Sequence, residues 1–335
     1  MSPDFLLHLY HEKKYHLAFE KMMNKAFPFL FLLFSFPLAA QDTGSGLDFL
    51  NISPSARMLS ISEAGTASLT GPAAIYSNPS LLVFEPSSAL DVNYTLWVSD
   101  VENQFAAVNL MKDSRALAFG VYNSRATDFE ARDRPGPSQG SFSISYLSLS
   151  AAGAYRLGPV AAGITAHYLR EEIFELRANG YAITAGASTE FMNGRIRAGA
   201  SLKNLGEMEE LDTEATKLPA EFNLGVMANL VEFTTPGAND LPVLLSLHMN
   251  WLKPIEENSS SDYTGRGNEN FFTVALSANA SDLLFLQAGY IFGPTERPFS
   301  TGMGLRIEPV RVNYALVPFS TGFGTVHSIG IQFYF

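Results

Sequence analysis

The sequence predicts an all-β fold: an antiparallel transmembrane β-barrel of about 14 strands, preceded by an N-terminal plug segment. Three observations lead to this prediction. Apolar and polar residues alternate along most of the chain after residue 87, as strands with two different faces require. Short turns and longer polar connections mostly alternate between these strands, which is typical of outer-membrane barrels. The chain also ends in an alternating apolar strand with a terminal Phe335.

Residues 1–40 are predicted to be a secretory signal peptide. The stretch 26–40 carries no charge, follows two lysines and ends in two alanines, small residues that suit signal peptidase. It is shorter than a membrane-spanning helix, which needs about 20 residues. The residues before this stretch form an unusual extension, so we expect the true start at Met22 or Met23. The alternative is a buried hydrophobic helix.

Residues 41–87 do not alternate and stand between the signal peptide and the first strand. A segment inserted into a polar barrel lumen must satisfy its backbone through helices, turns or lumen partners. We expect 41–87 to form such a plug, in which Arg57 pairs with an inward-facing acid. The candidate acids are Asp91, Glu190 and Glu221. The alternative is a surface cap in which Asn78-Pro79 is an ordinary turn.

Residues 88–335 are predicted to form the barrel. In its first strand the apolar residues share one face and the polar residues Asp91, Asn93 and Thr95 share the other. The parity of the apolar residues changes around Tyr146, where we expect a bulge or a strand end. The predicted strands are 90–98, 102–111, 115–123, 146–157, 159–170, 178–192, 195–204, 219–230, 241–252, 270–280, 283–293, 300–307, 310–318 and 325–335.

The connections between these strands fall into two classes. Short turns are predicted on one side of the membrane, and the Asn193-Gly194 pair is the strongest hairpin signal among them. Longer polar connections are predicted on the outer side, at 124–141, 171–177, 205–218, 254–269, 294–299 and 318–324.

Composition narrows the class of protein. Charged residues make up 16% of the chain, against about 25% in a typical soluble domain. The net charge of −11 argues against nucleic-acid binding, which requires a basic surface. The lack of cysteine excludes disulfides, thiolate catalysis and cysteine-ligated metals. A soluble β-sandwich would also alternate, but it explains neither the low charge nor the aromatic residues near strand ends. The terminal residues Ile331, Phe333 and Phe335 are predicted to be the barrel-insertion signal and to face lipid.

Signals for catalysis and for metal binding are weak. Gly136–Gly140 matches the G-x-S-x-G nucleophile pattern but lies in a Pro- and Arg-rich connection instead of a strand–turn–helix unit. His167, His248 and His327 lack the paired spacing of a zinc site. The acidic run at 207–214 is most simply a solvated loop. We therefore predict no catalytic residue, no metal and no cofactor.

Two sequence motifs in 41–87 and two near later strands resemble those of a known family. Phe49, Leu50, Ala56 and Arg57 resemble its F-L-x-(I/L)-x-x-x-A-R opening, and Asn78-Pro79 within NPSLL resembles its N-P-A-x-L phrase. NYALVPF at 313–319, followed by GTVHSI, resembles its D-Y-A-x-x-P-F ending, and Asn204-Leu205-Gly206 adds another match. Together these motifs resemble the PorV/PorQ family of outer-membrane barrels, distant relatives of the FadL-type channels. Serines replace an alanine and an arginine of the pattern at positions 80 and 328, and Asn313 replaces an aspartate.

The resemblance implies a fourteen-stranded barrel of the outer membrane whose N-terminal segment packs inside it. It also implies a role in type IX secretion. The partners would be secreted proteins with C-terminal sorting domains, other secretion components, the barrel-assembly machinery and outer-membrane lipid. We therefore expect a non-enzymatic binding or shuttle barrel whose outer loops 124–141, 205–218 and 254–269 contact the cargo.

The alternative is a FadL-like transporter of hydrophobic small molecules, and a third possibility is an outer-membrane hydrolase. Inward faces that carry mostly small and polar residues favour the shuttle over the transporter.

Overall fold

The structure of the protein is a computed structural model. The structure describes residues 47–131, 140–212, 214–234, 241–255, 270–320 and 322–335. The predicted signal peptide, with Met22 and Met23, lies outside these residues, as does the G-x-S-x-G pattern except for its last glycine.

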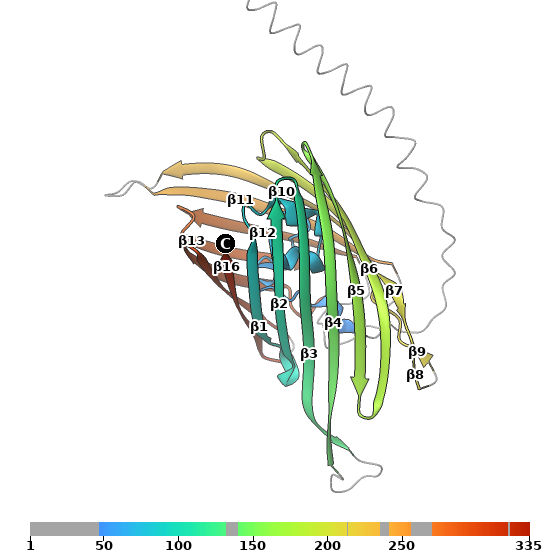
Figure 1. The fold of residues 1–335 in the computed structure, drawn as a ribbon. Coiled ribbons are helices and arrows are strands. Elements are labelled where there is room, and N and C mark those ends of the chain that lie inside the picture. The colour runs from blue at the N-terminus through green and yellow to red at the C-terminus, as the bar shows by residue number, and fades with distance from the viewer. Residues whose placement is uncertain (1–46, 132–139, 213, 235–240, 256–269, 321) are drawn as a thin grey trace, which may run out of the picture. The chain divides into compact units, whose positions relative to one another are not determined.

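Fourteen strands close into a single antiparallel barrel (Figure 1), which confirms the predicted fold class. Each strand pairs with its neighbours in sequence, and β1 closes the barrel by pairing with β16. The barrel strands are β1 (Ala89–Leu96), β2 (Glu102–Lys112), β3 (Arg115–Ala131), β4 (Gly140–Leu157), β5 (Val160–Ile173), β6 (Leu176–Phe191), β7 (Ile196–Met208), β10 (Glu221–Thr234), β11 (Pro242–Pro254), β12 (Phe271–Ala280), β13 (Leu284–Phe292), β14 (Phe299–Ile307), β15 (Val310–Pro318) and β16 (Thr325–Tyr334). Two short strands, β8 (Glu210–Leu211) and β9 (Glu214–Ala215), pair with each other in the β7–β10 connection.

Several strands run further than alternation predicts. β3 and β4 extend into the predicted connection 124–141, and β5 and β6 leave only two residues between Ile173 and Leu176. A strand that continues past the lipid needs no apolar outer face, so alternation does not mark its true end. The predicted long connections at 124–141 and 171–177 are therefore wrong in extent.

The predicted irregularity at Tyr146 lies on the neighbouring strand. β4 pairs with β5 without interruption through Tyr146, which stands opposite Glu171. The register shift falls instead in β3, between Ala126 and Phe129. The bulge belongs to β3 because the three β3 steps from Ala126 to Phe129 are matched by two β4 steps, from Ile144 to Phe142. The prediction for Tyr146 is wrong.

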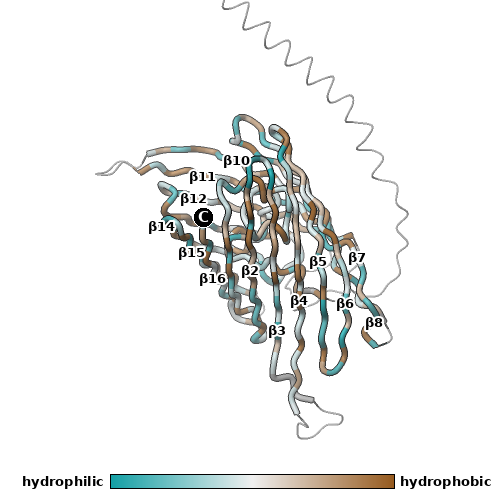
Figure 2. Tube along the Cα trace, viewed as in Figure 1, coloured by the Kyte–Doolittle hydropathy of each residue, from teal (hydrophilic) through white to brown (hydrophobic). Residues whose placement is uncertain are grey.

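The two faces of the barrel wall are distributed as the alternation predicts. In β1 the apolar Leu90, Val92, Tyr94 and Leu96 face outward and are exposed, whereas the polar residues between them are buried. Figure 2 shows hydropathy changing from residue to residue along the strands. Exposed apolar side chains on thirteen of the fourteen wall strands, and partly exposed ones on β11, form the surface that lipid covers. Within the described part of the chain, no helix is long and apolar enough to cross a membrane.

The segment that precedes β1 lies inside the barrel. It folds into four short helices: η2 (Asp48–Asn51), α2 (Ala56–Leu59), η3 (Pro72–Tyr76) and η4 (Pro79–Phe84). Almost all of their described side chains are buried against inward-facing residues of the wall, and the blue ribbon in Figure 1 runs behind the strands. We call residues 47–88 the plug. One further short helix, η5 (Val98–Asp100), lies in the β1–β2 connection.

Candidate functional site: the plug and the lumen wall

The centre of the lumen on the β2–β6 side is an aromatic cluster. Phe49 of the plug is fully buried and stacks on Tyr146 at 5.3 Å between ring centroids, with the rings 9° apart. It also contacts Tyr122 at 5.3 Å. Tyr76 of the plug packs edge-on against Tyr122 at 5.6 Å and against Phe105 at 5.8 Å. Two plug aromatics therefore fill a site whose walls are aromatic side chains of the barrel.

Apolar side chains extend this cluster toward the end of the β4–β5–β6 hairpins. The buried aliphatic residues packed with it include Leu47, Leu50, Leu169, Ala178, Met208 and Leu218. Ile144 and Ile173 pair two residues beyond Tyr146 and Glu171, so they share the inward face. Phe142 and Phe174 contact each other at 6.0 Å, and Phe174 is 60% exposed. An apolar face thus runs from an exposed hairpin tip to Phe49.

A small cavity lies beside Leu50, Ile52 and Tyr76. Its volume is about 30 Å³, which suits a water molecule but no larger organic ligand. Polar residues line its other side, including Ser53, Ser77, Glu63, Lys203 and Glu221. This cavity is therefore too small for an organic molecule, which could occupy it only if plug residues moved.

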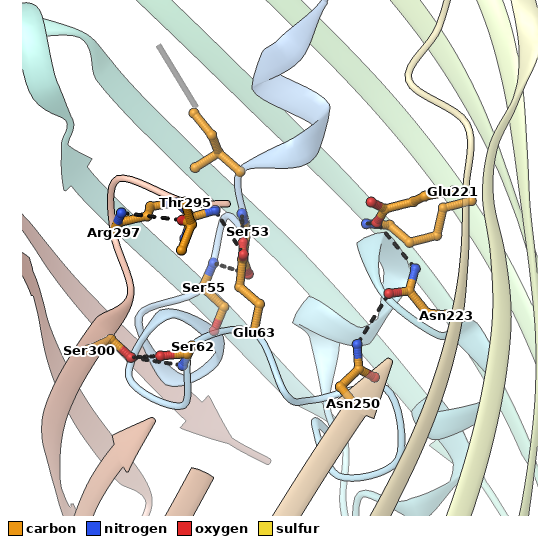
Figure 3. A network of polar contacts seen from close by, with 12 residues as sticks. Ser53, Ser55, Ser62, Glu63, Glu221, Asn223, Asn250, Thr295, Arg297 and Ser300 are labelled. Atoms are coloured by element: carbon orange, nitrogen blue, oxygen red, sulfur yellow. Dashed lines mark hydrogen bonds and ion pairs between the residues drawn. The ribbon is translucent and has the colours of Figure 1, made fainter. Parts of the chain in front are cut away.

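Charged residues beside this cavity are paired. Lys203 Nζ lies 2.5 Å from Glu221 Oε1, and Asn223 donates to the same oxygen at 3.2 Å. Asn250 in turn donates to Asn223 (Figure 3). The pair lies on neighbouring strands, β7 and β10, where Lys203 and Glu221 stand directly opposite each other.

A second pair joins the plug to a connection between strands. Arg297, which lies between β13 and β14, places Nη2 at 2.9 Å from Glu63 Oε2 of the plug, and both side chains are buried. The Ser53 amide donates to the other carboxylate oxygen at 2.9 Å. Arg297 also lies over the Trp97 ring at 5.4 Å. Figure 3 shows this pair beside the contact between Ser62 and Ser300.

The turn at Ser62 and Glu63 is conformationally demanding. Both residues have positive φ, 49° and 63°, which costs energy in residues other than glycine. Ser62 is held by Ser300, which accepts from its amide at 2.8 Å and shares a hydroxyl contact at 2.7 Å. The wall contacts at Ser300 and Arg297 thus maintain a strained turn of the plug.

Asn78 and Pro79 begin η4 and lock the middle of the plug. The Asn78 side chain accepts from Ser80 N at 3.2 Å as the N-cap and donates to Thr66 O at 2.7 Å. Pro79 occupies the first helical position, where its missing amide hydrogen costs nothing. Wall glycines admit this turn: a side chain at Gly186 would overlap Asn78 Oδ1, and one at Gly163 would lie 2.6 Å from the Pro79 carbonyl carbon.

Arg57 does not pair with any of the three predicted acids. Its Nη1 donates to Gln332 Oε1 at 3.1 Å and to Thr70 O at 3.3 Å. Glu190 is already bound by Arg156 and Arg197, and Glu221 by Lys203. Asp91 accepts from Asn93. Arg57 therefore forms none of the direct ion pairs that were predicted with these acids, although its charge acts on Asp91 at longer range.

The remaining predicted plug residues have structural contacts. Ala56 is fully buried, and its amide donates to Asn93 Oδ1 at 3.0 Å. Leu50 belongs to the apolar cluster with Phe49. The structure brings Phe49 and Leu50 together in the apolar cluster, and Leu50 also lines the cavity, whereas Arg57 and Asn78 contact other parts of the wall.

The residues predicted as the insertion signal, Ile331, Phe333 and Phe335, all point outward and are 42–60% exposed. Ile331 and Phe333 lie in β16, which pairs with both β1 and β15. Their role in insertion stays a prediction.

The histidines occupy three separate environments. His167 contacts the hydroxyls of Ser150 and Thr184 at 2.7 and 3.1 Å, and His248 contacts those of Ser68 and Ser277, both at 2.9 Å. His327 faces outward and contacts the Tyr314 hydroxyl. In the part of the chain that the structure describes, no three metal-ligating side chains come together.

Tyr76 connects the plug to the Ser150–His167 contact. Ser150 donates to the Tyr76 hydroxyl at 2.8 Å, and Tyr76 donates to Ser148. Burial raises the pKa of Tyr76 to about 12, more than these two hydrogen bonds lower it. The phenol therefore stays neutral, as an apolar site requires.

Sequence reasoning missed the residues that build this site. The sequence did not predict a site role for Tyr76, Tyr146, Glu171, Glu63 and Arg297, because each acquires its partner from a distant part of the chain. For the strand residues Tyr146 and Glu171, inward parity was the available signal, and it names a face without naming a neighbour. Tyr76, Glu63 and Arg297 lie outside the barrel strands and have no such parity.

Comparison with known proteins supports the fold. The toluene transporter TbuX of Ralstonia pickettii superimposes with a TM-score of 0.53 at 12% identity, covering 85% of this chain and 98% of TbuX. The chain has the fold of an outer-membrane barrel. A FadL homologue of Pseudomonas aeruginosa gives a TM-score of 0.49 at 13% identity, covering 83% of this chain and 97% of that one. The sequence matches no protein-family model and no curated protein.

Proposed function

We propose that this barrel passes small hydrophobic molecules across the outer membrane, and that the plug moves to admit them. The observation that carries the proposal is the aromatic cluster around Phe49, Tyr76, Tyr122 and Tyr146 inside a barrel. A purely structural plug could be held by the polar contacts found elsewhere in the lumen. An aromatic site reached along an apolar face suits a hydrophobic ligand.

The structure changes the balance between the sequence-based alternatives. The shuttle was favoured because inward faces were expected to be small and polar. On the β2–β6 side they instead carry Phe105, Tyr122, Tyr146 and Leu169. The toluene transport for which TbuX is named agrees with the proposal, although the two chains share only 12% identity.

The type IX shuttle function rests on the PorV/PorQ motifs alone, as do its partners among secreted proteins and secretion components. Its loops also differ from expectation. Much of 124–141 belongs to strands, and 256–269 lies outside the described residues. The barrel-assembly machinery as partner is an expectation common to both functions.

We further propose that the protein is not an enzyme. The Ser150–His167 contact is the arrangement nearest to a nucleophile and base among the described residues. The other imidazole nitrogen contacts Thr184, where a catalytic triad places a carboxylate. The pair is also buried beneath Tyr76.

A disulfide lock on the plug tests the proposed function. The chain has no cysteine, so Ser62→Cys with Ser300→Cys adds a single pair where the two hydroxyls now lie 2.7 Å apart. Uptake of radiolabelled toluene by cells that produce the oxidised variant should fall to the level of cells without the protein. Reduction should restore it.

The matched control is Thr95→Cys with Ser328→Cys, whose hydroxyls lie 2.6 Å apart but join two wall strands. This lock should leave uptake unchanged. Equal uptake by the oxidised plug lock and the control lock would refute a mobile plug, and no uptake by the unmodified protein would refute transport.

A further inference from the structure

We infer that the aromatic site selects uncharged molecules and rejects carboxylates of the same size. The inference rests on the proposed function and narrows its substrate class. It follows from the charges that surround the site.

The cations beside the site are already neutralised. Lys203 lines the cavity but is bound to Glu221 at 2.5 Å, and it is largely buried. Arg297 is bound to Glu63, the other acid of the cavity lining, at 2.9 Å. Among the described residues, both cations next to this cavity are therefore paired, and a ligand carboxylate would have to break one of these pairs to gain a counter-charge.

Several hydrogen-bonding groups near the aromatic rings are also committed, although the Ser77 hydroxyl in the cavity lining has no partner among the described residues. Both ring nitrogens of His167 contact hydroxyl groups. The Tyr76 hydroxyl is shared between Ser148 and Ser150. Burying a carboxylate without a counter-charge or hydrogen bonds is strongly unfavourable, whereas a neutral ring loses little on leaving water for this site.

An acid lies at the outer edge of the site. Glu171 is buried, stands opposite Tyr146 across the β4–β5 pair and opposite Ala178 across the β5–β6 pair. It accepts from the Thr216 hydroxyl at 2.8 Å, and among the described residues no lysine or arginine forms an ion pair with it. A ligand that follows the apolar face from Phe174 to Phe49 must pass this carboxyl group, which disfavours anions further.

The experiment compares toluene with benzoate, which have the same ring and differ by the charged group. Uptake is measured at pH 7 in cells that lack other uptake channels, and the uptake of cells without the protein is subtracted. The unmodified protein should take up toluene at least ten times faster than benzoate.

Two variants test the origin of the selectivity. Glu221→Gln leaves Lys203 without its counter-charge and should raise benzoate uptake about tenfold. Glu171→Gln removes the acid at the edge and should raise it by a few-fold, which keeps the test valid if the first variant does not fold. Glu172→Gln is the control. Glu172 is next to Glu171 in the chain but points to the outer face, where it pairs with Arg170 and Arg177, so its replacement should leave benzoate uptake unchanged.

Each outcome bears on one claim. Toluene uptake with equal or faster benzoate uptake would overturn the selectivity while leaving transport of hydrophobic molecules in place. Benzoate uptake that stays low in both variants would also overturn it, because charge would then not be the barrier. Uptake of neither compound by the unmodified protein would refute the proposed function itself.

Discussion

Replacing Phe49 with alanine should release the plug without unfolding the barrel. The side chain is fully buried, and it stacks on Tyr146 and contacts Tyr122, each at 5.3 Å. A buried Phe→Ala change costs about 3–5 kcal/mol, in part because a cavity remains. Since the contacts of Phe49 join the plug to the wall, the cost falls on plug docking. Strand pairing is not affected.

Even the lower end of this range predicts a large increase in the undocked fraction of the plug. A loss of about 3 kcal/mol multiplies the undocked fraction of the plug roughly a hundredfold, because each 1.4 kcal/mol is a factor of ten. The assay is limited proteolysis of purified protein in detergent, with mass spectrometry of cuts within 47–88. Uptake of bulky antibiotics by cells provides the functional readout. Heat-modifiable gel mobility reports whether the barrel stays closed.

The control is Phe119→Ala, which removes the same side chain from the outer face, where it is 53% exposed. It should leave plug proteolysis unchanged. If Phe49→Ala and Phe119→Ala gave the same cleavage rates and the same permeability, Phe49 would not hold the plug, and the reasoning would fail.

Three further predictions concern the plug and the outer face. Glu63→Gln leaves Arg297 buried without its counter-charge and should weaken plug docking by about 3–5 kcal/mol, read as faster hydrogen exchange at 58–66; unchanged exchange would contradict it. Gly186→Leu should prevent docking of the Asn78 turn, because even a β-carbon there would overlap the Asn78 side chain. Protease-resistant plug in that variant would refute the contact. Ile329→Arg, near the middle of β16 on the lipid face, should destabilise the barrel by about 2–4 kcal/mol in refolding titrations into vesicles, whereas a change below 1 kcal/mol would argue against lipid contact there.

The sequence by itself determined the class of fold, the approximate strand count and the two faces of the wall. Alternation has a physical origin that needs no tertiary information. Successive side chains of a strand point to opposite sides of the sheet, and the side that faces lipid must carry apolar side chains. Leu90 and Val92 therefore face outward and Asp91 and Asn93 inward, as predicted. The position of the plug before the first strand also followed from the break in alternation at 41–87.

Strand ends and contacts depended on tertiary structure. β3 continues to Ala131 because it pairs with β4 beyond the region where lipid imposes a pattern. The break in alternation places Arg57 in the plug but does not choose its partner, and Gln332 lies 275 positions away in the chain. Glu63 and Arg297 are separated by 234 positions and meet only because the barrel closes around the plug. Phe49, Tyr122 and Tyr146 form one site for the same reason: period two specifies a side of the sheet, whereas closure and register decide which inward residues face the same part of the plug.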